Sequence, residues 1–373
     1  MKVLFIVQGE GRGHLTQAIT LEEILRRNGH EVVEVLVGKS NTRRLPGFFN
    51  RSIQAPVKRF LSPNFPPANK RVSMSRSIAY NLMQVPAYLR SICYIHRRIH
   101  ETDADLVINF YELLTGLTYL FFRPSVPQIS VGHQYLFLHH DFEFPQKNPV
   151  SLLMLRFFTR LTCIGAKEKL ALSFRPMETD EEAHIRVVPP LLRREVLCCE
   201  AASGEYVHGY MVNAGFGESI SQWHEQHPEV PLHFFWDKPD EPEVCRMDET
   251  LSFHQLDDEK FLRYMSSCRA YATTAGFESV CEAMYLGKPL LMVPAHIEQD
   301  CNAYDAMIAG AGIIGDSFEL ESLLRFAGKY IPNCDFIYWA RSCERRIILE
   351  LEKLAASQSE ITSISTYTNY LPI

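Results

Sequence analysis

The sequence predicts an α/β protein with two doubly wound domains that face each other across a cleft. Each half of the chain opens with a short, continuous apolar run, then small residues, then an amphipathic stretch. This is the pattern of a buried strand, a turn and a helix. A length of 373 residues exceeds one ordinary hydrophobic core and fits two. Two βα series of comparable length therefore predict two parallel sheets covered by helices.

The first series begins at Val3–Val7, a run of β-branched and aromatic residues typical of a buried strand. An amphipathic helix is predicted over Leu15–Asn28, where Gly29 ends it, and Val32–Val37 predicts the second strand. We expect further strands at Leu106–Phe110 and Gln128–Val131.

Two segments of the first half have less regular patterns. Residues 41–80 hold many Arg, Pro and Ser without a clear period, so we expect long loops there. Leu152–Phe174 interleaves Leu and Phe with basic residues. We favour a core helix with a solvated basic face over a patch that touches an anionic membrane, at roughly two to one.

The second series begins after the polar segment 200–205. We expect strands at Tyr206–Asn213, Leu232–Trp236, Ala270–Thr273 and Pro289–Val293. We expect helices at Ser219–His227, 258–267, 278–286 and Ile337–Leu354, the last followed by a Ser/Thr-rich tail. These elements predict an N-terminal domain over 1–203, a C-terminal domain over 204–336, and a terminal helix and tail over 337–373 that pack back on the first domain.

The charge is unevenly distributed along the chain. Residues 1–200 carry 26 Lys and Arg against 18 Asp and Glu, whereas residues 201–373 carry 12 against 26. This asymmetry suggests that the basic half meets something anionic, and an anionic membrane surface is one candidate. Nucleic-acid binding is not expected, because the basic residues show no aromatic-interleaved motif.

The ten cysteines contain no C-x-x-C pair, which favours reduced cytosolic thiols over a disulfide framework or a zinc site. The first apolar run is too short for a signal peptide, and no apolar stretch reaches 18 residues. We therefore expect a cytoplasmic protein, either free or peripheral at the inner membrane face.

The first chemical motif is a glycine-rich turn, Gly9-Glu10-Gly11-Arg12-Gly13-His14, between the first strand and the first helix. Glycines there allow backbone N–H groups to approach a ligand, and a histidine at such a turn can act as a general base. The spacing is not that of a dinucleotide-binding loop. A plain tight turn is the alternative, at roughly one chance in four.

Two other segments imitate ligand sites. Gly38-Lys39-Ser40 resembles the end of a phosphate-binding loop, but Val33 occupies the place of the required first glycine. Asp103 and Asp105 resemble a metal-binding pair, but they lie at the entrance of a strand, where solvated carboxylates are common. We therefore expect no metal and no cofactor.

The most informative motif spans residues 273–302. It reads as a strand that ends in small residues, a glycine turn, and a helix with Glu278 and Ser279 in its first turn and Glu282 one turn later. A helix N-terminus with small residues suits a diphosphate, and a carboxylate one turn deeper suits a ribose diol. Simple capping by Glu278 and Ser279 is the alternative.

This spacing resembles the donor-binding motif of the GT-B glycosyltransferases, in particular the UDP-glycosyltransferases and the N-acetylglucosaminyltransferase that completes lipid II. From Gly276, the positions of Ser279, Glu282, Gly287 and Pro289 agree with that motif. After Pro294, an acidic residue followed by Gln, and then Asn, also agree. The glycine loop ending in His14 resembles the acceptor-side loop of these families.

The resemblance implies a nucleotide-sugar donor and an acceptor hydroxyl group. The basic first half of the chain fits an acceptor that carries phosphate, such as a lipid-linked saccharide. The resemblance also implies His14 as the base, Ser279 on the diphosphate, Glu282 on the ribose, and Glu298 and Gln299 on the donor sugar. The remaining expected donor-side residues are Gly215, Phe216, Gly217, Thr274, Ala275, Gly276, Glu278 and Asn302, and the expected acceptor-side residues are Gly11, Arg12, Gly13 and His133.

Thr274 stands where the plant-type motif has a histidine and where retaining enzymes commonly have a glutamate. The departure implies that hydroxyl and backbone groups hold the phosphate and that the reaction inverts the anomeric carbon. Two alternatives share this architecture. A nucleotide-sugar 2-epimerase would turn over UDP-N-acetylglucosamine without an acceptor, and a non-catalytic nucleotide-sugar-binding protein would show no turnover.

Overall fold

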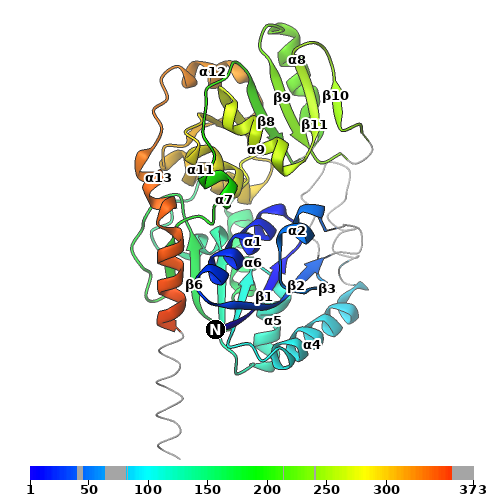
Figure 1. Ribbon diagram of the computed structural model, residues 1–373, viewed down its shortest axis with the longest axis vertical. Helices are drawn as coiled ribbons and strands as arrows, with labels where there is room; N and C mark the ends of the chain where they lie inside the picture. Colours follow the sequence, from blue (N-terminus) through cyan, green and yellow to red (C-terminus); the bar gives the residue numbers. More distant parts are fainter. Residues whose placement is uncertain (40–44, 64–80, 82, 213, 239–240, 355–373) are drawn as a thin grey trace, which may run out of the picture.

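The computed structural model describes residues 1–39, 45–63, 81, 83–212, 214–238 and 241–354, which form two α/β lobes stacked along the long axis of the molecule (Figure 1). The N-terminal lobe contains a seven-stranded parallel sheet in the order β3-β2-β1-β4-β5-β6-β7. Its strands are β1 (Lys2–Gln8), β2 (Glu31–Lys39), β3 (Val57–Leu61), β4 (Leu106–Phe110), β5 (Gln128–Gly132), β6 (Ala166–Leu172) and β7 (Ile185–Val188). Its helices are α1 (Arg12–Arg27), α2 (Gly47–Ser52), α4 (Val85–Glu101), α5 (Leu113–Phe122), the 3₁₀ helix η1 (His133–Leu138), α6 (Pro149–Thr162) and the short α7 (Arg194–Leu197), which leads into the second lobe.

The C-terminal lobe contains a second seven-stranded sheet, in the order β10-β11-β9-β8-β12-β13-β14, and only its edge strand β10 is antiparallel to its neighbour. Its strands are β8 (Val207–Met211), β9 (Leu232–Trp236), β10 (Val244–Arg246), β11 (Leu251–Gln255), β12 (Ala270–Thr273), β13 (Leu290–Met292) and β14 (Gly312–Ile314). Its helices are η2 (Ala214–Phe216), α8 (Gly217–Gln226), α9 (Asp258–Ser267), α10 (Phe277–Tyr285), α11 (Ile297–Ile308), α12 (Leu320–Ala327) and α13 (Cys334–Arg341). In both sheets the strand order reverses direction beside the first strand of the lobe, so the predicted doubly wound fold is confirmed.

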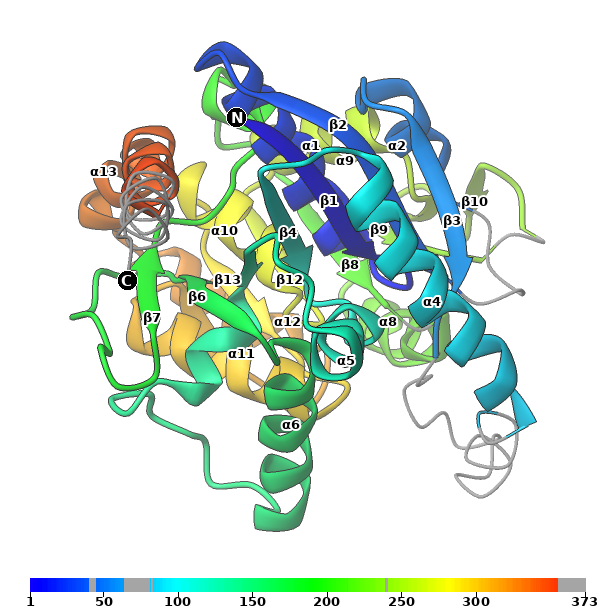
Figure 2. The same ribbon diagram turned by 90° about the horizontal axis from the view of Figure 1, so that it is seen from below.

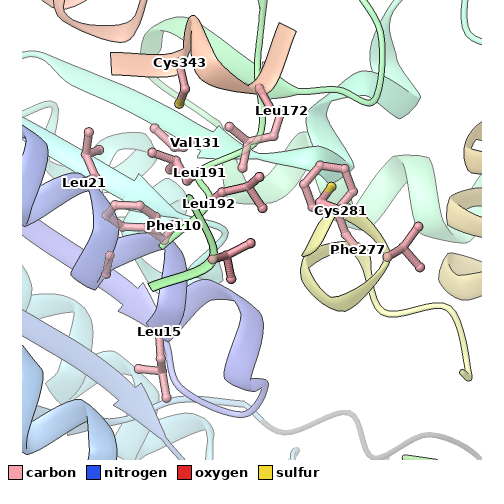
Figure 3. Close-up of a cluster of buried hydrophobic side chains, with 14 of the residues drawn as sticks. Leu15, Leu21, Phe110, Val131, Leu172, Leu191, Leu192, Phe277, Cys281 and Cys343 are labelled. Atoms are coloured by element: carbon pink, nitrogen blue, oxygen red, sulfur yellow. The ribbon is translucent and has the colours of Figure 1, made fainter. Parts of the chain in front are cut away.

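One hydrophobic core runs through both lobes. Phe110 of β4 and Leu192 of the connecting segment share this core with Phe277 and Cys281 of α10, and all four side chains are buried. Figure 3 shows α10 of the C-terminal lobe beside the connecting segment and the N-terminal sheet. Because the contact between the lobes is apolar and continuous, it fixes the position of α10 relative to the first sheet.

The chain returns to the N-terminal lobe at its end. After α13 and a turn at Ser342, residues 343–354 are helical and run alongside the lower lobe in Figure 1. Ile347 and Leu351 are fully buried in the shared core. Glu344 accepts hydrogen bonds from Arg27 Nη2 at 2.8 Å and from Asn28 Nδ2 at 2.9 Å, both at the end of α1. These contacts tie the terminal helix to the first lobe.

Three expected elements differ from the structure. The predicted loop over 41–80 contains α2 and β3 among its described residues; the basic side chains of β3 hid its strand pattern. The apolar segment 152–174 is not one helix, because α6 ends at Thr162 and β6 begins at Ala166. The turn of small residues expected after the first strand of the second half, at 214–217, is the 3₁₀ helix η2 followed by the start of α8. Ser40, residues 64–80, Asn213 and the tail beyond 354 lie outside the described residues.

Within the part of the chain that the structure describes, no helix combines the length and the apolar character that are needed to cross a bilayer.

Candidate active site

A cavity of about 1420 Å³ lies between the two lobes, at the carboxyl ends of strands from both sheets. This is where ligands of doubly wound sheets bind, because loops and helix N-termini converge there. Eleven predicted site residues of the two motifs line it, together with four residues that were not predicted. The eleven are Gly11, Arg12, Gly13, His14, Gly276, Glu278, Ser279, Glu282, Glu298, Gln299 and Asn302, and the four are Tyr111, Gln134, Arg193 and Asp258.

The glycine loop places His14 in the first turn of α1. The loop is tight because the Gly9 N–H donates to the Gly38 carbonyl at 2.8 Å, and a side chain at Gly9 would overlap that carbonyl. His14 is buried, and its Nδ1 lies 3.1 Å from Gln17 Oε1, one turn further along the helix. Burial lowers the pKa of His14, which favours the neutral imidazole that a general base requires.

Tyr111 packs against His14 from the carboxyl end of β4. Its φ of 59° lies in the left-handed region, which is costly for a residue with a side chain and is concentrated at functional sites. Its ring stacks on His14 with the ring centres 5.5 Å apart, and its hydroxyl group hydrogen-bonds to Thr159 at 2.8 Å. The tyrosine therefore fixes one face of the imidazole. The position of an aromatic residue directly after a buried strand is the signal in the sequence that could have identified it.

In the C-terminal lobe, a strained turn leads into α10. Ala275 has a φ of 61°, and Asn302 Nδ2 donates to its carbonyl at 3.3 Å. Thr274 Oγ1 accepts the Val212 N–H at 3.2 Å and so joins the ends of β12 and β8. No side chain caps the helix at Gly276, and the Ser279 hydroxyl donates to the Gly276 carbonyl at 3.2 Å. The N-terminus of α10 therefore opens into the cavity with its N–H groups oriented as an anion would need them.

Glu282 is held by an arginine that the sequence did not reveal. Arg193 Nε lies 2.7 Å from Glu282 Oε1, and its Nη2 lies 3.3 Å from Oε2. Glu282 is nearly buried, and the Arg193 side chain is 18% exposed and also lines the cavity. This bidentate pair fixes the carboxylate plane and adds a guanidinium to the site.

Further polar contacts cross the cleft. Gln134 Nε2, from η1, donates to Glu298 Oε1 of α11 at 2.9 Å and lies 3.4 Å from His14 Nε2. Arg12 Nη1 lies 3.2 Å from Asp258 Oδ1 of α9. Within the C-terminal lobe, Gln299 Oε1 accepts the Ala295 N–H at 2.9 Å. Side chains of the first lobe thus contact helices of the second lobe at several points across the cleft.

Several predicted residues lie away from the cavity surface. Gly215, Phe216 and Gly217 follow β8 without lining the cavity, and Thr274 and Ala275 shape the turn behind it. His133 is 1% exposed, stacks on Phe277 with ring centres 4.1 Å apart, and its Nδ1 hydrogen-bonds to the Leu172 carbonyl at 2.8 Å. The structure therefore places His133 in the packing between the lobes, where it cannot touch an acceptor in the cavity.

One cluster among the described residues has the ligand types and spacing of a metal site, namely His139, His140 and Asp141. It lies outside the cavity. His139 Nε2 donates to the Glu178 carbonyl at 2.9 Å, and its Nδ1 accepts the Asp141 N–H at 3.1 Å. Because both ring nitrogens are used within the chain, this histidine has no lone pair left for a metal.

Comparison with known proteins agrees with this geometry. The family model of glycosyl transferase family 1 matches residues 1–329. Phytolacca americana UGT2, solved with UDP-2fluoro-glucose and pterostilbene, is 13% identical with a TM-score of 0.63, over 95% of this chain and 98% of that one. Arabidopsis thaliana UGT89C1, solved with quercetin, is 16% identical with a TM-score of 0.61 over the same shares. CalG4, the calicheamicin glycosyltransferase, is 14% identical with a TM-score of 0.56, over 100% and 99%. No curated protein sequence matches.

Two Rossmann-like lobes with a cleft between the carboxyl ends of their sheets have the arrangement of the GT-B fold. The chain belongs to glycosyl transferase family 1.

Proposed function

We propose that the enzyme transfers a sugar from a UDP-sugar to an acceptor hydroxyl group, with inversion and without a metal ion. The observation that carries this proposal is that His14 and the N-terminus of α10 border the same cavity from opposite lobes. One supplies a base to an acceptor, and the other supplies a positive helix end to a leaving diphosphate.

The donor would lie along α10. We assign the diphosphate to the N–H groups at Gly276 and Ser279, and the ribose hydroxyls to Glu282, which Arg193 orients. Glu298 and Gln299 of α11 would face the donor sugar. The guanidinium of Arg193 and the positive end of α10 together offset the charge that develops on the leaving group, which is the task of a metal ion in other transferases.

The reaction would be an in-line displacement. The acceptor oxygen attacks the anomeric carbon as its proton passes to His14 Nε2, and the bond between that carbon and the diphosphate oxygen breaks. The bonding electrons leave with the nucleoside diphosphate, and the new glycosidic bond has the inverted configuration. The closed cleft excludes water, which would otherwise hydrolyse the donor.

Donor binding can be tested by a thermal-shift screen of nucleotide sugars and free nucleoside diphosphates, because a ligand of the folded state raises its melting temperature. We expect UDP-sugars to stabilise the protein. His14→Ala should abolish transfer while donor-induced stabilisation persists, and unchanged transfer would remove His14 from the mechanism. Turnover of UDP-N-acetylglucosamine without an acceptor would instead indicate an epimerase, and donor binding without any turnover would indicate a binding protein.

We further propose that the acceptor is lipid-linked and that the enzyme binds an anionic membrane at its cytoplasmic face. Helix α6 supports this proposal. Its outward face carries exposed Val150, Leu153, Met154 and Phe157, the spacing of one helical stripe, in place of the solvated basic face expected from the sequence. Figure 2 shows α6 extending from the lobe beside α5. The helix begins near the cleft, because Lys147 lies 2.9 Å from Asp300 of α11.

An apolar stripe beside Arg160, on the more basic half of the chain, suits the interface of an anionic bilayer. All ten cysteines are free thiols, as is typical of a reducing compartment. Flotation with neutral vesicles and with vesicles containing phosphatidylglycerol tests the membrane proposal. We expect binding to the anionic vesicles and its loss in Phe157→Asp. The control is Ile331→Asp, at an exposed aliphatic residue of the other lobe, which should bind normally. Equal partitioning of all three proteins would contradict the proposal.

A further inference from the structure

A chain of hydrogen bonds leads from His14 across the cleft. His14 Nδ1 lies 3.1 Å from Gln17 Oε1, and Gln17 Nε2 donates to Glu278 Oε1. His14 and Gln17 share one turn of α1 in the N-terminal lobe, whereas Glu278 lies in the first turn of α10 in the C-terminal lobe. Glu278 reaches the imidazole through the Gln17 amide, and Glu298, which Gln134 bonds on the other side of the ring, is the second carboxylate whose charge acts on His14.

The bond to Glu278 fixes the orientation of the Gln17 side-chain amide. A carboxylate accepts hydrogen bonds and does not donate them, so it selects the NH₂ end of Gln17. The oxygen of the same amide must then face His14, and it can only accept a proton. His14 therefore carries its hydrogen on Nδ1 and keeps a lone pair on Nε2. That nitrogen lies 3.4 Å from Gln134 Nε2, on the side of the ring that borders the cavity.

Gly13 makes this contact between the lobes sterically feasible. A Cβ atom at Gly13 would overlap the Glu278 carboxylate, so a residue with a side chain would force this carboxylate away from its position beside α1. The third glycine of the loop is thus explained by the approach of a carboxylate, which is a requirement independent of the turn itself. The chain from His14 to Glu278 exists only when the lobes are in contact.

We propose that Glu278 is a positioning residue for the base: acting through Gln17, its carboxylate holds His14 in the tautomer whose Nε2 lone pair faces the cavity. This inference rests on the proposed role of His14 as the base. It assigns Glu278 to the catalytic histidine, whereas the sequence placed it among the donor contacts. When His14 takes the acceptor proton, the charge of Glu278 stabilises the imidazolium across the amide, and no proton passes through Gln17. Closure of the cleft therefore completes the base.

The charge of Glu278 depends on pH near neutrality. Burial raises the pKa of Glu278 to about 7, and Glu298 of α11 and Glu282 of α10 raise it further, although Arg193 pairs with Glu282. The other charged groups that border this part of the cavity are Arg12 of α1 and Asp258 of α9, which pair with each other, and Glu10 of the glycine loop. A protonated Glu278 no longer selects the amide NH₂, so Gln17 can turn over and His14 loses its tautomer preference. We expect transfer to fall as the pH drops below about 7.

Nuclear magnetic resonance of the full chain labelled with ¹⁵N-histidine tests the inference without donor or acceptor, because ring nitrogen shifts distinguish the two tautomers. The His14→Ala protein identifies the His14 signals. At pH 8 we expect the Nδ1-protonated form in the wild type. Glu278→Ala and Gln17→Leu should each give a mixture of tautomers and a lower His14 pKa. Gly13→Ala, which displaces the carboxylate without removing it, should do the same.

Asp300→Asn is the matched control, because it removes an ion pair between the lobes that is not part of this chain. It should leave the His14 signals unchanged. In transfer assays Glu278→Gln should lower kcat at least about tenfold, part of what a general base contributes, and leave the KM for the donor nearly constant. The inference would be overturned if His14 were protonated on Nε2 in the wild type. It would also be overturned if the His14 signals were the same in the wild type and in the Glu278 and Gln17 variants. Retained transfer in His14→Ala would instead refute the proposed function and leave the hydrogen-bond chain as a structural feature.

Discussion

The ion pair between Arg193 and Glu282 offers the sharpest test of how the donor side is built. Arg193→Ala removes both hydrogen bonds of the guanidinium to the Glu282 carboxylate, at 2.7 and 3.3 Å. The Glu282 side chain, which is 7% exposed, then keeps its charge without a partner cation. Breaking a buried pair by removing one partner costs about 3–5 kcal/mol, because the remaining charge is uncompensated. Since Arg193 is 18% exposed and water can reach the gap, we expect the lower end, about 3 kcal/mol.

The measurement is urea unfolding at pH 7.5, combined with donor titration. Arg193→Ala should lower the free energy of unfolding by about 3 kcal/mol and weaken UDP-sugar binding at least about tenfold, because it removes a cation and the orientation of the ribose contact. Arg193→Met with Glu282→Leu removes both charges and should recover most of the stability but none of the affinity. Stability loss below about 1 kcal/mol in the single variant would show that the pair is solvated, and our account of the site would be wrong.

Three further predictions concern the backbone and buried charges. Burial raises the pKa of Glu112 to about 7, so the folded state holds this proton more tightly than the unfolded chain does. This group should therefore lower the stability by on the order of 3 kcal/mol as the pH rises from about 4.5 to 7. In urea unfolding at pH 5 and 8, Glu112→Gln should make the fall in stability smaller by this amount, while the contribution of Glu278 remains. Ala275→Gly relieves a left-handed φ and should change stability by less than about 1 kcal/mol, whereas the same replacement at Ala283, inside α10, should cost about 1 kcal/mol or more. Gly116→Ala places a methyl group against the Leu161 carbonyl, and we expect this overpacking of α5 on α6 to lower the melting temperature by several degrees. Gly29→Ala, where there is open space but a positive φ, should show a smaller loss.

The sequence predicted buried strands well, because a continuous apolar run has few alternatives. The predicted ranges Leu106–Phe110, Leu232–Trp236 and Ala270–Thr273 agree with the observed strands residue by residue. The prediction failed where a helix and the next strand have the same apolar composition. Between Thr162 and Ala166 a helix ends and a strand begins without a break in the apolar pattern, and the turn at Gly165 was too weak a signal.

The site shows a different limit. The motifs identified the residues that the chain carries close together, such as His14 in its loop and Ser279 in its helix, because local spacing records local geometry. Gln17 and Arg193 were not predicted because their roles depend on partners that are distant in the sequence. Gln17 bonds Glu278, 261 residues away, and Arg193 bonds Glu282, 89 residues away. No periodicity or spacing records a hydrogen bond that forms only when two lobes meet.

Contact between the lobes also changes the interpretation of the uneven charge along the chain. A basic first half and an acidic second half suggested an anionic partner, but the structure pairs many of these charges within the molecule. Arg12 with Asp258, Lys147 with Asp300 and Arg175 with Asp305 all join the N-terminal lobe to the C-terminal lobe, at 3.2, 2.9 and 3.5 Å. Part of the charge asymmetry therefore serves to hold the two lobes together across the cleft. Attraction between oppositely charged lobes weakens as salt screens it, whereas the apolar contact through Phe277 does not. High salt should thus weaken these ion pairs between the lobes before it disturbs the shared core.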